Sequence, residues 1–344
     1  MSTLKLEQVQ NPTGKGARSF MVSALAHHPA SHRVAGVTAD FGCFFDVESG
    51  AQGARWKEPS GGDRALFRSD GQLVIVGAAL ALVTTEGKRS ALTKSLFPGV
   101  EPMFSATSVG DLAVISVIAG DRTPKMTMRG IDLRTGEARW TQKGFIDGLT
   151  AHAGQVYGLE ASRVVRVDLA TGTLTTLAEG PGALACLHVD DDGLWVCERD
   201  APVIHHFDPT GTHRAKLHIQ ALDSLQHMTR VRSELLVGGV TLHEVVDGFP
   251  QDPPFPISDL FAVDLKLEQA TPLGYQDTCT ALGWKHADIE LHVVRTRGQL
   301  GIEFLRPFLR AHNHEADFPL WKLAGLVHDE PTSDDATSYV RHAA

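Results

Sequence analysis

Histidine is abundant in this chain, and several histidines occupy similar places in successive β-rich segments. The 344 residues include 17 histidines. Five segments carry one near the end of their first strand: His27 or His28, His152, His188, His227 and His286. Neutral imidazoles that converge from separate strands are common ligands of iron, copper and zinc. Such a set would have the chemistry of a metal centre on the axis of a ring of strands.

The spacing of these histidines argues against one shared metal. The offset from the histidine to the following strand differs between segments by several residues. In a strand, a slip of one residue turns a side chain to the opposite face. We therefore expect separate histidines near one rim of the fold. No cofactor is favoured, and a divalent metal is the alternative.

Other catalytic motifs are incomplete in this sequence. His243-Glu-Val-Val-Asp247 has aspartate where a zinc protease motif needs its second histidine, and no Gly-x-Ser-x-Gly nucleophile elbow is present. Glu290 and His292 are two residues apart in one expected strand, so they lie on the same face, as acid–base catalysis needs. An isolated pair of this kind is also typical of a surface hydrogen bond. The sequence alone therefore assigns no catalytic residue.

A recurring turn separates the β-rich segments that would position these side chains. Its copies are Asp46–Gly50, Asp132–Gly136, Asp168–Gly172 and the contracted Asp208–Gly211. Asp and Thr side chains in such a turn bond the nearby backbone, and Gly accepts a positive φ. The period is about 40 residues with four short strands per unit, which is typical of a propeller blade. Gly87 marks a further unit between Gly50 and Gly136, and two weaker copies follow Gly211, which brings the count to seven, with six or eight as the margin.

These residues resemble the quinoprotein-like and WD40-like propeller superfamily. Asp132 to Trp140 follows the repeat Asp-x-x-Thr-Gly-x-x-x-Trp closely. The resemblance covers roughly residues 19–307 and implies an all-β fold, a seven-bladed β-propeller with four-stranded antiparallel blades. We expect one domain over residues 1–327, with the strand at 4–10 pairing with the last blade. Residues 328–344 are expected to be a disordered tail.

A second resemblance concerns the fifth unit. Leu194–Glu198, followed by Ile204–Gly211, is similar to a repeat of the streptogramin-lyase type of propeller. In that family a Glu and His pair acts with Mg²⁺ in an elimination reaction. The two resemblances together imply an enzyme as the alternative function, either a metal-dependent lyase or a quinoprotein-like oxidoreductase with an axial site.

Composition narrows the classes of partner. Acidic residues outnumber basic ones by 41 to 32, for a net charge of −9. Nucleic acids and anionic membranes reward clustered Lys and Arg, so neither is an expected partner. The first twenty residues contain no continuous apolar segment of the kind found in a signal peptide or membrane span. A cytoplasmic location is therefore expected, while the sequence does not predict the oligomeric state.

Four cysteines are present without a Cys-x-x-Cys spacing. Cys186 and Cys197 are equidistant from the centre of the turn Asp190–Gly193. In an antiparallel hairpin this spacing places the two residues opposite each other. Two interpretations stay open for the pair, a structural disulfide or two reduced thiols in the core.

Two insertions between second and third strands offer a surface for recognition. They are Ala119–Lys125 in the third unit and Asp247–Pro256 in the sixth. We expect both to be loops that proline stiffens at low entropic cost. The leading hypothesis is a non-enzymatic scaffold that binds a protein or peptide partner through one face. Tolerated surface loops are the alternative explanation. The residues expected to contact the partner are Arg122, Pro124, Lys125, Phe249 and Phe255.

Overall fold

The computed structural model describes most of the chain up to residue 272 and short segments beyond it. The described residues are 5–8, 22–31, 33–38, 41–46, 52–58, 64–93, 103–119, 125–220, 222–231, 234–246, 249–265, 269–272, 293–295 and 325–328. Apart from a 3₁₀ turn at Pro29–Ser31, the regular elements in these residues are strands. This part of the chain has no helix with the length and apolarity of a membrane span.

Six four-stranded antiparallel sheets follow one another along the described chain, and each sheet, or blade, joins its strands in chain order. Blades 1 to 3 consist of β2 (Val22–His28), β3 (Arg33–Thr38), β4 (Phe41–Asp46) and β5 (Gln52–Lys57); β6 (Arg64–Phe67), β7 (Leu73–Val76), β8 (Leu80–Val83) and β9 (Arg89–Ala91); and β10 (Met103–Val109), β11 (Leu112–Ala119), β12 (Lys125–Asp132) and β13 (Ala138–Lys143). Blades 4 to 6 consist of β14 (Asp147–His152), β15 (Gln155–Glu160), β16 (Arg163–Val167) and β17 (Leu174–Glu179); β18 (Leu184–Asp190), β19 (Gly193–Glu198), β20 (Val203–Phe207) and β21 (His213–His218); and β22 (Ser224–Val231), β23 (Glu234–Val246), β24 (Phe249–Asp264) and β25 (Gln269–Pro272).

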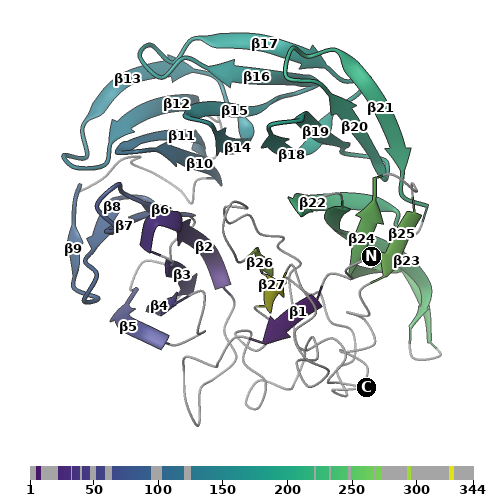
Figure 1. Ribbon diagram of the computed structural model, residues 1–344, viewed down its shortest axis with the longest axis horizontal. Coiled ribbons are helices and arrows are strands. Elements are labelled where there is room, and N and C mark those ends of the chain that lie inside the picture. The colour runs from purple at the N-terminus through teal and green to yellow at the C-terminus, as the bar shows by residue number, and fades with distance from the viewer. Residues whose placement is uncertain are drawn as a thin grey trace.

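The blades are arranged around a common centre (Figure 1). Their innermost strands β2, β6, β10, β14, β18 and β22 contact one another in that order. The expected all-β architecture with four-stranded antiparallel blades is confirmed. Blade 4 illustrates the local cause, because the β16 sequence Arg-Val-Val-Arg-Val is rich in β-branched residues, and glycines with positive φ reverse the chain at Gly154 and Gly172.

A three-stranded sheet joins the two ends of the described chain. In it, β1 (Lys5–Gln8) pairs antiparallel with β27 (Gly325–His328), and β26 (Val293–Arg295) pairs parallel with β27. The structure describes six four-stranded blades, and most of the segment expected to form a seventh lies outside the described residues. The expected tail at 328–344 also lies outside them, except for His328.

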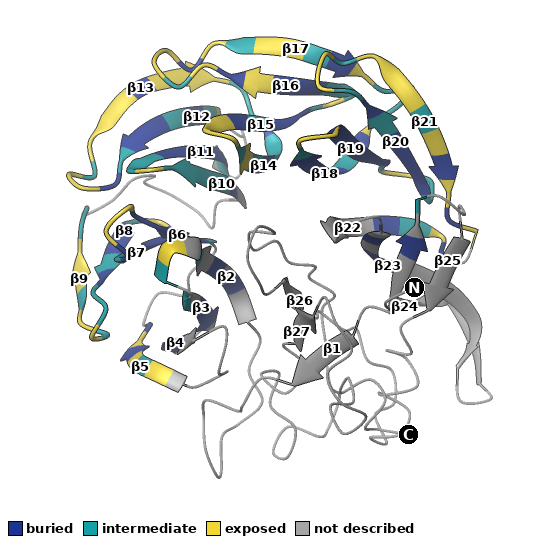
Figure 2. Cartoon of the chain, in the orientation of Figure 1, coloured by how far each residue is buried: buried dark blue, intermediate teal, exposed yellow. Residues whose placement is uncertain are grey.

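The apolar core lies in layers between consecutive blades. Trp140 of blade 3, for example, packs in one buried cluster with Ile146 and with Val156 and Val165 of blade 4. The outermost strands β13, β17 and β21 carry the exposed residues, whereas the strands closer to the centre are largely buried (Figure 2). Because each layer needs two blades to form, burial of apolar surface holds neighbouring blades together.

The glycine of the recurring turn lies against the outermost strand of the preceding blade. A Cβ on Gly172 in blade 4 would lie 2.5 Å from the ring of Trp140 in blade 3. The indole Nε1–H of Trp140 donates to the Leu169 carbonyl oxygen at 2.9 Å. The same relation recurs in blade 5, where a Cβ on Gly211 would collide with the Leu177 carbonyl oxygen of blade 4. The turn therefore joins two blades as well as two strands.

The aspartate of the turn is held as a carboxylate by its own hairpin. Asp168 Oδ1 accepts hydrogen bonds from the Thr171 N–H at 2.8 Å, the Thr171 hydroxyl at 3.0 Å and the Ala170 N–H at 2.9 Å. These bonds lower the pKa of Asp168 below its ordinary value. The pKa values of Asp132 and Asp208 are shifted in the same direction. The recurring turn therefore gives the fold a set of carboxyl groups that favour the charged form.

Because of these carboxylates, we expect the free energy of unfolding to decrease at acidic pH. Because the pKa of Asp168 is lower than the value of about 3.9 in an unfolded chain, the unfolded state binds more protons in this range. The contribution is complete above about pH 5 and is lost as the pH falls toward the folded-state pKa. Asp168→Asn keeps the acceptor oxygen but cannot titrate. Urea unfolding midpoints measured from about pH 6 down to about pH 3 should therefore fall less steeply for this variant, and identical slopes would contradict the assignment.

Candidate partner-binding arm and the histidine-bearing rim

The second and third strands of blade 6 extend well beyond the rest of their sheet. The partner β22 pairs with β23 only as far as Val240, and β25 pairs with β24 only from Phe261 onward. Between these limits, residues 241–246 of β23 and 249–257 of β24 pair only with each other among the described strands. We call this two-stranded segment the arm, and it projects from the blade in Figure 1. Along both of its edges, no other described strand pairs with it.

The expectation that Asp247–Pro256 forms a loop is wrong for the part that the structure describes. Phe249 to Pro256 belongs to β24, with Phe249 opposite Val246 and Phe255 opposite His243. Proline cannot donate a ladder hydrogen bond, but an edge strand tolerates it where the missing N–H would face outward. Since β23 is the single partner of β24 here among the described strands, the prolines of β24 are compatible with strand structure. A register shift between His243 and Val245 accommodates the extra residues on β24.

The arm has a strongly one-sided charge. The sequence over residues 241–260, which includes the arm, contains no Lys and no Arg, although the whole chain has 32 of them. The acidic residues of this stretch are Glu244, Asp247, Asp252 and Asp259. The arm therefore combines two phenylalanines with a net negative charge, and opposite charge on a partner would favour association.

The expected contact residues of blade 3 are only partly placed. Arg122 and Pro124 lie outside the described residues. Lys125 is the first residue of β12 and is exposed, and Met126 beside it is 50% exposed. The β11–β12 and β23–β24 connections both follow the second strand of a blade, so they lie at the edge of the sheets where the innermost strands begin. The structure thus puts Lys125 at the same edge of its blade as the arm has in blade 6.

Two of the five expected histidines lie near one turn, the β18–β19 turn, at the sheet edge opposite to the arm. His152 ends β14, and its Nε2 lies 3.0 Å from Asp191 Oδ1 in the next blade. His188 on β18 is buried, with Nε2 3.4 Å from Asp190 Oδ2. Each imidazole thus has its own carboxylate in the turn. Among the residues that the structure describes, no three His, Cys, Asp or Glu side chains are grouped as metal ligands.

For the other expected histidines, the structure describes a strand position or nothing. His27 is on β2 and His227 is on β22, and only their strand positions are described. His286 lies outside the described residues. His28, the alternative to His27, accepts or donates a 2.8 Å hydrogen bond between its Nδ1 and Ser31 Oγ. Burial, followed by the nearby Arg33 charge, lowers the pKa of His28 and favours the neutral ring.

Hydrogen bonds between neighbouring blades lie along the rim that carries His152 and His188. Asp111 of blade 3 accepts hydrogen bonds at Oδ1 from the N–H and the hydroxyl of Ser69 in blade 2, both at 2.9 Å. Its Oδ2 accepts a hydrogen bond from Arg134 Nε at 2.5 Å. Burial acts to raise the pKa of Asp111, but the bonds from Ser69 and Arg134 outweigh it and lower the pKa. The contacts of His152 have the same inter-blade character, so the described part of this rim connects blades.

Sequence reasoning assigned no role to a partly buried carboxylate–imidazole pair in blade 5. His205 on β20 is 4% exposed, and its Nε2 lies 2.7 Å from Glu198 Oε1 on β19. Its Nδ1 lies 3.1 Å from His213 Nε2 on β21. The hairpin register carries the signal, because His205 is opposite Val196 and Glu198 is two residues further along the same face. These three side chains come from the second, third and fourth strands of the blade, away from the innermost strand that faces the axis.

Comparisons with known proteins bear on the fold. No protein-family model and no curated protein matches the sequence. The extracellular domain of a hybrid two-component system from B. thetaiotaomicron is similar at 13% identity and a TM-score of 0.53, over 79% of this chain and 38% of that one. The Cps50 (Swd1) β-propeller domain of Myceliophteria thermophila is similar at 13% identity and a TM-score of 0.50, over 63% and 80%. The strand order together with this likeness shows that the chain is a β-propeller.

Proposed function

We propose that this propeller is a scaffold that binds a basic protein or peptide through the arm of blade 6. The observation that carries the proposal is the extension of β23 and β24 beyond both of their neighbours. An isolated two-stranded hairpin is marginally stable in water. An arm of this length is therefore better explained if another chain covers it.

The edges of the arm, which no other described strand pairs with, suggest how a partner attaches. An unpaired strand edge is a template on which an extended segment of another chain can add as a further strand. Backbone hydrogen bonds would supply affinity, and alternate side chains would supply selectivity. Phe249 and Phe255 are the aromatic residues of the arm. Aromatic residues are enriched among the few that dominate binding energy at protein interfaces.

Charge defines the class of partner. The arm carries acidic residues and no basic ones, and the whole chain has a net charge of −9. A basic segment would gain attraction from this field, whereas an acidic one would be repelled. Since surface charges are screened within about 8 Å at physiological ionic strength, the affinity should fall as salt is added.

The test is a chain with a shortened arm. Thr241 and Ile257 are directly opposite each other, so an Asn-Gly turn can replace residues 242–256 and close the hairpin there. The tagged wild type and the shortened chain are each photo-crosslinked in the native host, and the captured proteins are identified and purified. We expect the shortened chain to fold, as judged by circular dichroism, and to lose the basic partner that the wild type captures.

Two further variants sharpen this test with the purified partner. Replacing Phe249 and Phe255 with alanine should weaken binding by about 2 kcal/mol or more. Replacing Glu244 and Asp252 with Gln and Asn should weaken binding and reduce its salt dependence. Calorimetric titration measures both effects, with Lys143→Ala on the exposed face of β13 as the matched control. Unchanged capture by the shortened chain would remove the proposal.

A further inference from the structure

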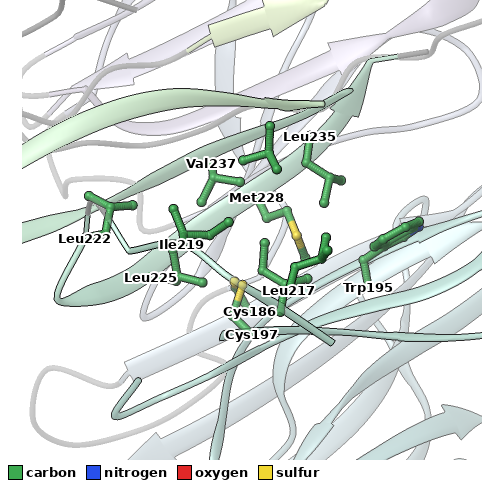
Figure 3. Close-up of a cluster of buried hydrophobic side chains, with 12 residues drawn as sticks. Cys186, Trp195, Cys197, Leu217, Ile219, Leu222, Leu225, Met228, Leu235 and Val237 are labelled. Carbon is green, nitrogen blue, oxygen red and sulfur yellow. The ribbon is translucent and has the colours of Figure 1, made fainter. Parts of the chain in front are cut away.

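Cys186 and Cys197 form a pair of thiols across the hairpin of blade 5. They are direct partners in the antiparallel pairing of β18 and β19, and both are free and buried. Figure 3 shows the two sulfurs side by side. The sequence expectation that the two residues lie opposite each other is confirmed.

The backbone at this pair suits a disulfide. Directly opposed residues of antiparallel strands have Cα atoms about 4.5 to 5.5 Å apart. Disulfides span Cα separations of about 4.4 to 6.8 Å. The two strands are already paired, so closing the bond requires no rearrangement of the sheet. The two residues differ in exposure, because Cys186 is 8% exposed and Cys197 is 0% exposed.

The pair lies in the layer between blades 5 and 6. Leu225 and Met228 of β22 and Leu235 of β23 belong to the same buried cluster (Figure 3). Burial and the neighbouring thiol raise the pKa of Cys197, so this thiol is protonated at neutral pH. The reduced pair is therefore stable in the closed fold, and its reaction needs a reagent that reaches Cys186 first.

We propose that Cys186 and Cys197 are a modification site that forms a reversible intramolecular disulfide with low-molecular-weight disulfides. The Cys186 thiolate attacks one sulfur of the reagent R–S–S–R, which forms a mixed disulfide and releases one R–S⁻. The Cys197 thiolate then attacks the Cys186 sulfur, which closes the protein disulfide and releases the second R–S⁻. The two thiol protons go to the released thiolates. The protein loses two electrons, and the reagent is reduced to two R–SH molecules.

The test uses the full-length chain and oxidised glutathione. Folded protein is incubated with the reagent, quenched in acid, unfolded and alkylated, and every cysteine is then quantified by mass spectrometry. No Lys or Arg lies between the two cysteines, whereas Asp190 to Asp192 do, so cleavage before aspartate separates them. We expect near-complete loss of alkylation at Cys186 and Cys197, a linked peptide pair lighter by two hydrogens, and full recovery with dithiothreitol.

Cys43 is the internal comparison, because it is as buried as Cys197 and its Sγ donates to the Phe44 carbonyl oxygen at 3.3 Å. It should stay alkylatable. Cys197→Ser should stop at one glutathione on Cys186. Equal alkylation of Cys186, Cys197 and Cys43 after oxidation would overturn the proposal, and so would a final product made only of mixed disulfides or linked dimers. The wild-type result decides by itself, so a variant that fails to fold does not affect the outcome.

Discussion

Replacing Arg89 with leucine is expected to lower the free energy of unfolding by about 3 kcal/mol. Arg89 Nε and its terminal nitrogen donate to Glu58 at 3.0 and 2.9 Å. The Glu58 side chain is 0% exposed and the Arg89 side chain is 24% exposed. Removing the guanidinium leaves a buried carboxylate without these two charged bonds, and the cost of burying that charge then falls on the folded state. Urea unfolding followed by tryptophan fluorescence measures the loss.

A second variant separates charge burial from simple loss of packing. Adding Glu58→Gln to Arg89→Leu removes the buried charge and should restore about 1 kcal/mol or more. The matched control is Arg139→Leu, which breaks a 2.5 Å ion pair with Asp132 whose arginine is 55% exposed. Exposed pairs of this kind contribute about 1 kcal/mol or less. If the control cost as much as Arg89→Leu, burial of Glu58 would not be the cause.

Gly172→Ala is expected to cost about 3 kcal/mol of stability. Its φ of +77° opposes a Cβ, and that Cβ would meet the Trp140 ring at 2.5 Å. Gly154 in the same blade has a φ of +75° but nothing within 4 Å of its Cβ position. Gly154→Ala should therefore cost only the backbone strain, about 1 to 2 kcal/mol. Thermal and urea unfolding of the two variants separate the backbone strain from the clash with Trp140. Equal losses of stability would show that the contact with blade 3 contributes nothing.

The sequence predicts the local chemistry of the hairpins well. The Asp and Thr bonds of the turn at Asp168 and the positive φ of Gly172 depend on residues only a few positions apart, and the structure has both. The opposition of Cys186 and Cys197 was predictable for the same reason, since it follows from counting outward from one turn. Structural features that depend only on residues close in sequence can be predicted from a single sequence.

The arm shows why other parts could not be predicted. Prolines around Phe255 favour a loop, because they break ladder bonds in a sheet that has strands on both sides. The long run of β23, with Asp247-Gly248 typical of a two-residue turn, was the opposing signal. Only the pairing limit of β25 reveals that β24 has no second partner among the described strands in this region.

The candidate residues on the rim depended on contacts between blades. His152 reaches Asp191, 39 positions away in the next blade. Ser69 and Asp111 are 42 positions apart. No pattern within one unit contains such a pair, because the relation depends on how two blades pack. The pair Glu198 and His205 is closer in sequence, but finding it required the register of the hairpin between them.

The placement of the turn glycines gives the propeller a direction of assembly. Gly172 lies on Trp140 of the blade before it, and Gly211 lies on Leu177 of the blade before that turn. As the chain leaves the ribosome, each blade is complete in sequence before the turn that will cover its outer strand has been synthesised. A nascent blade therefore waits for about one further repeat, some 40 residues, before it is fully enclosed. Ribosome-bound chains stalled one repeat apart should gain protease resistance one blade behind the last residue that has emerged from the ribosome.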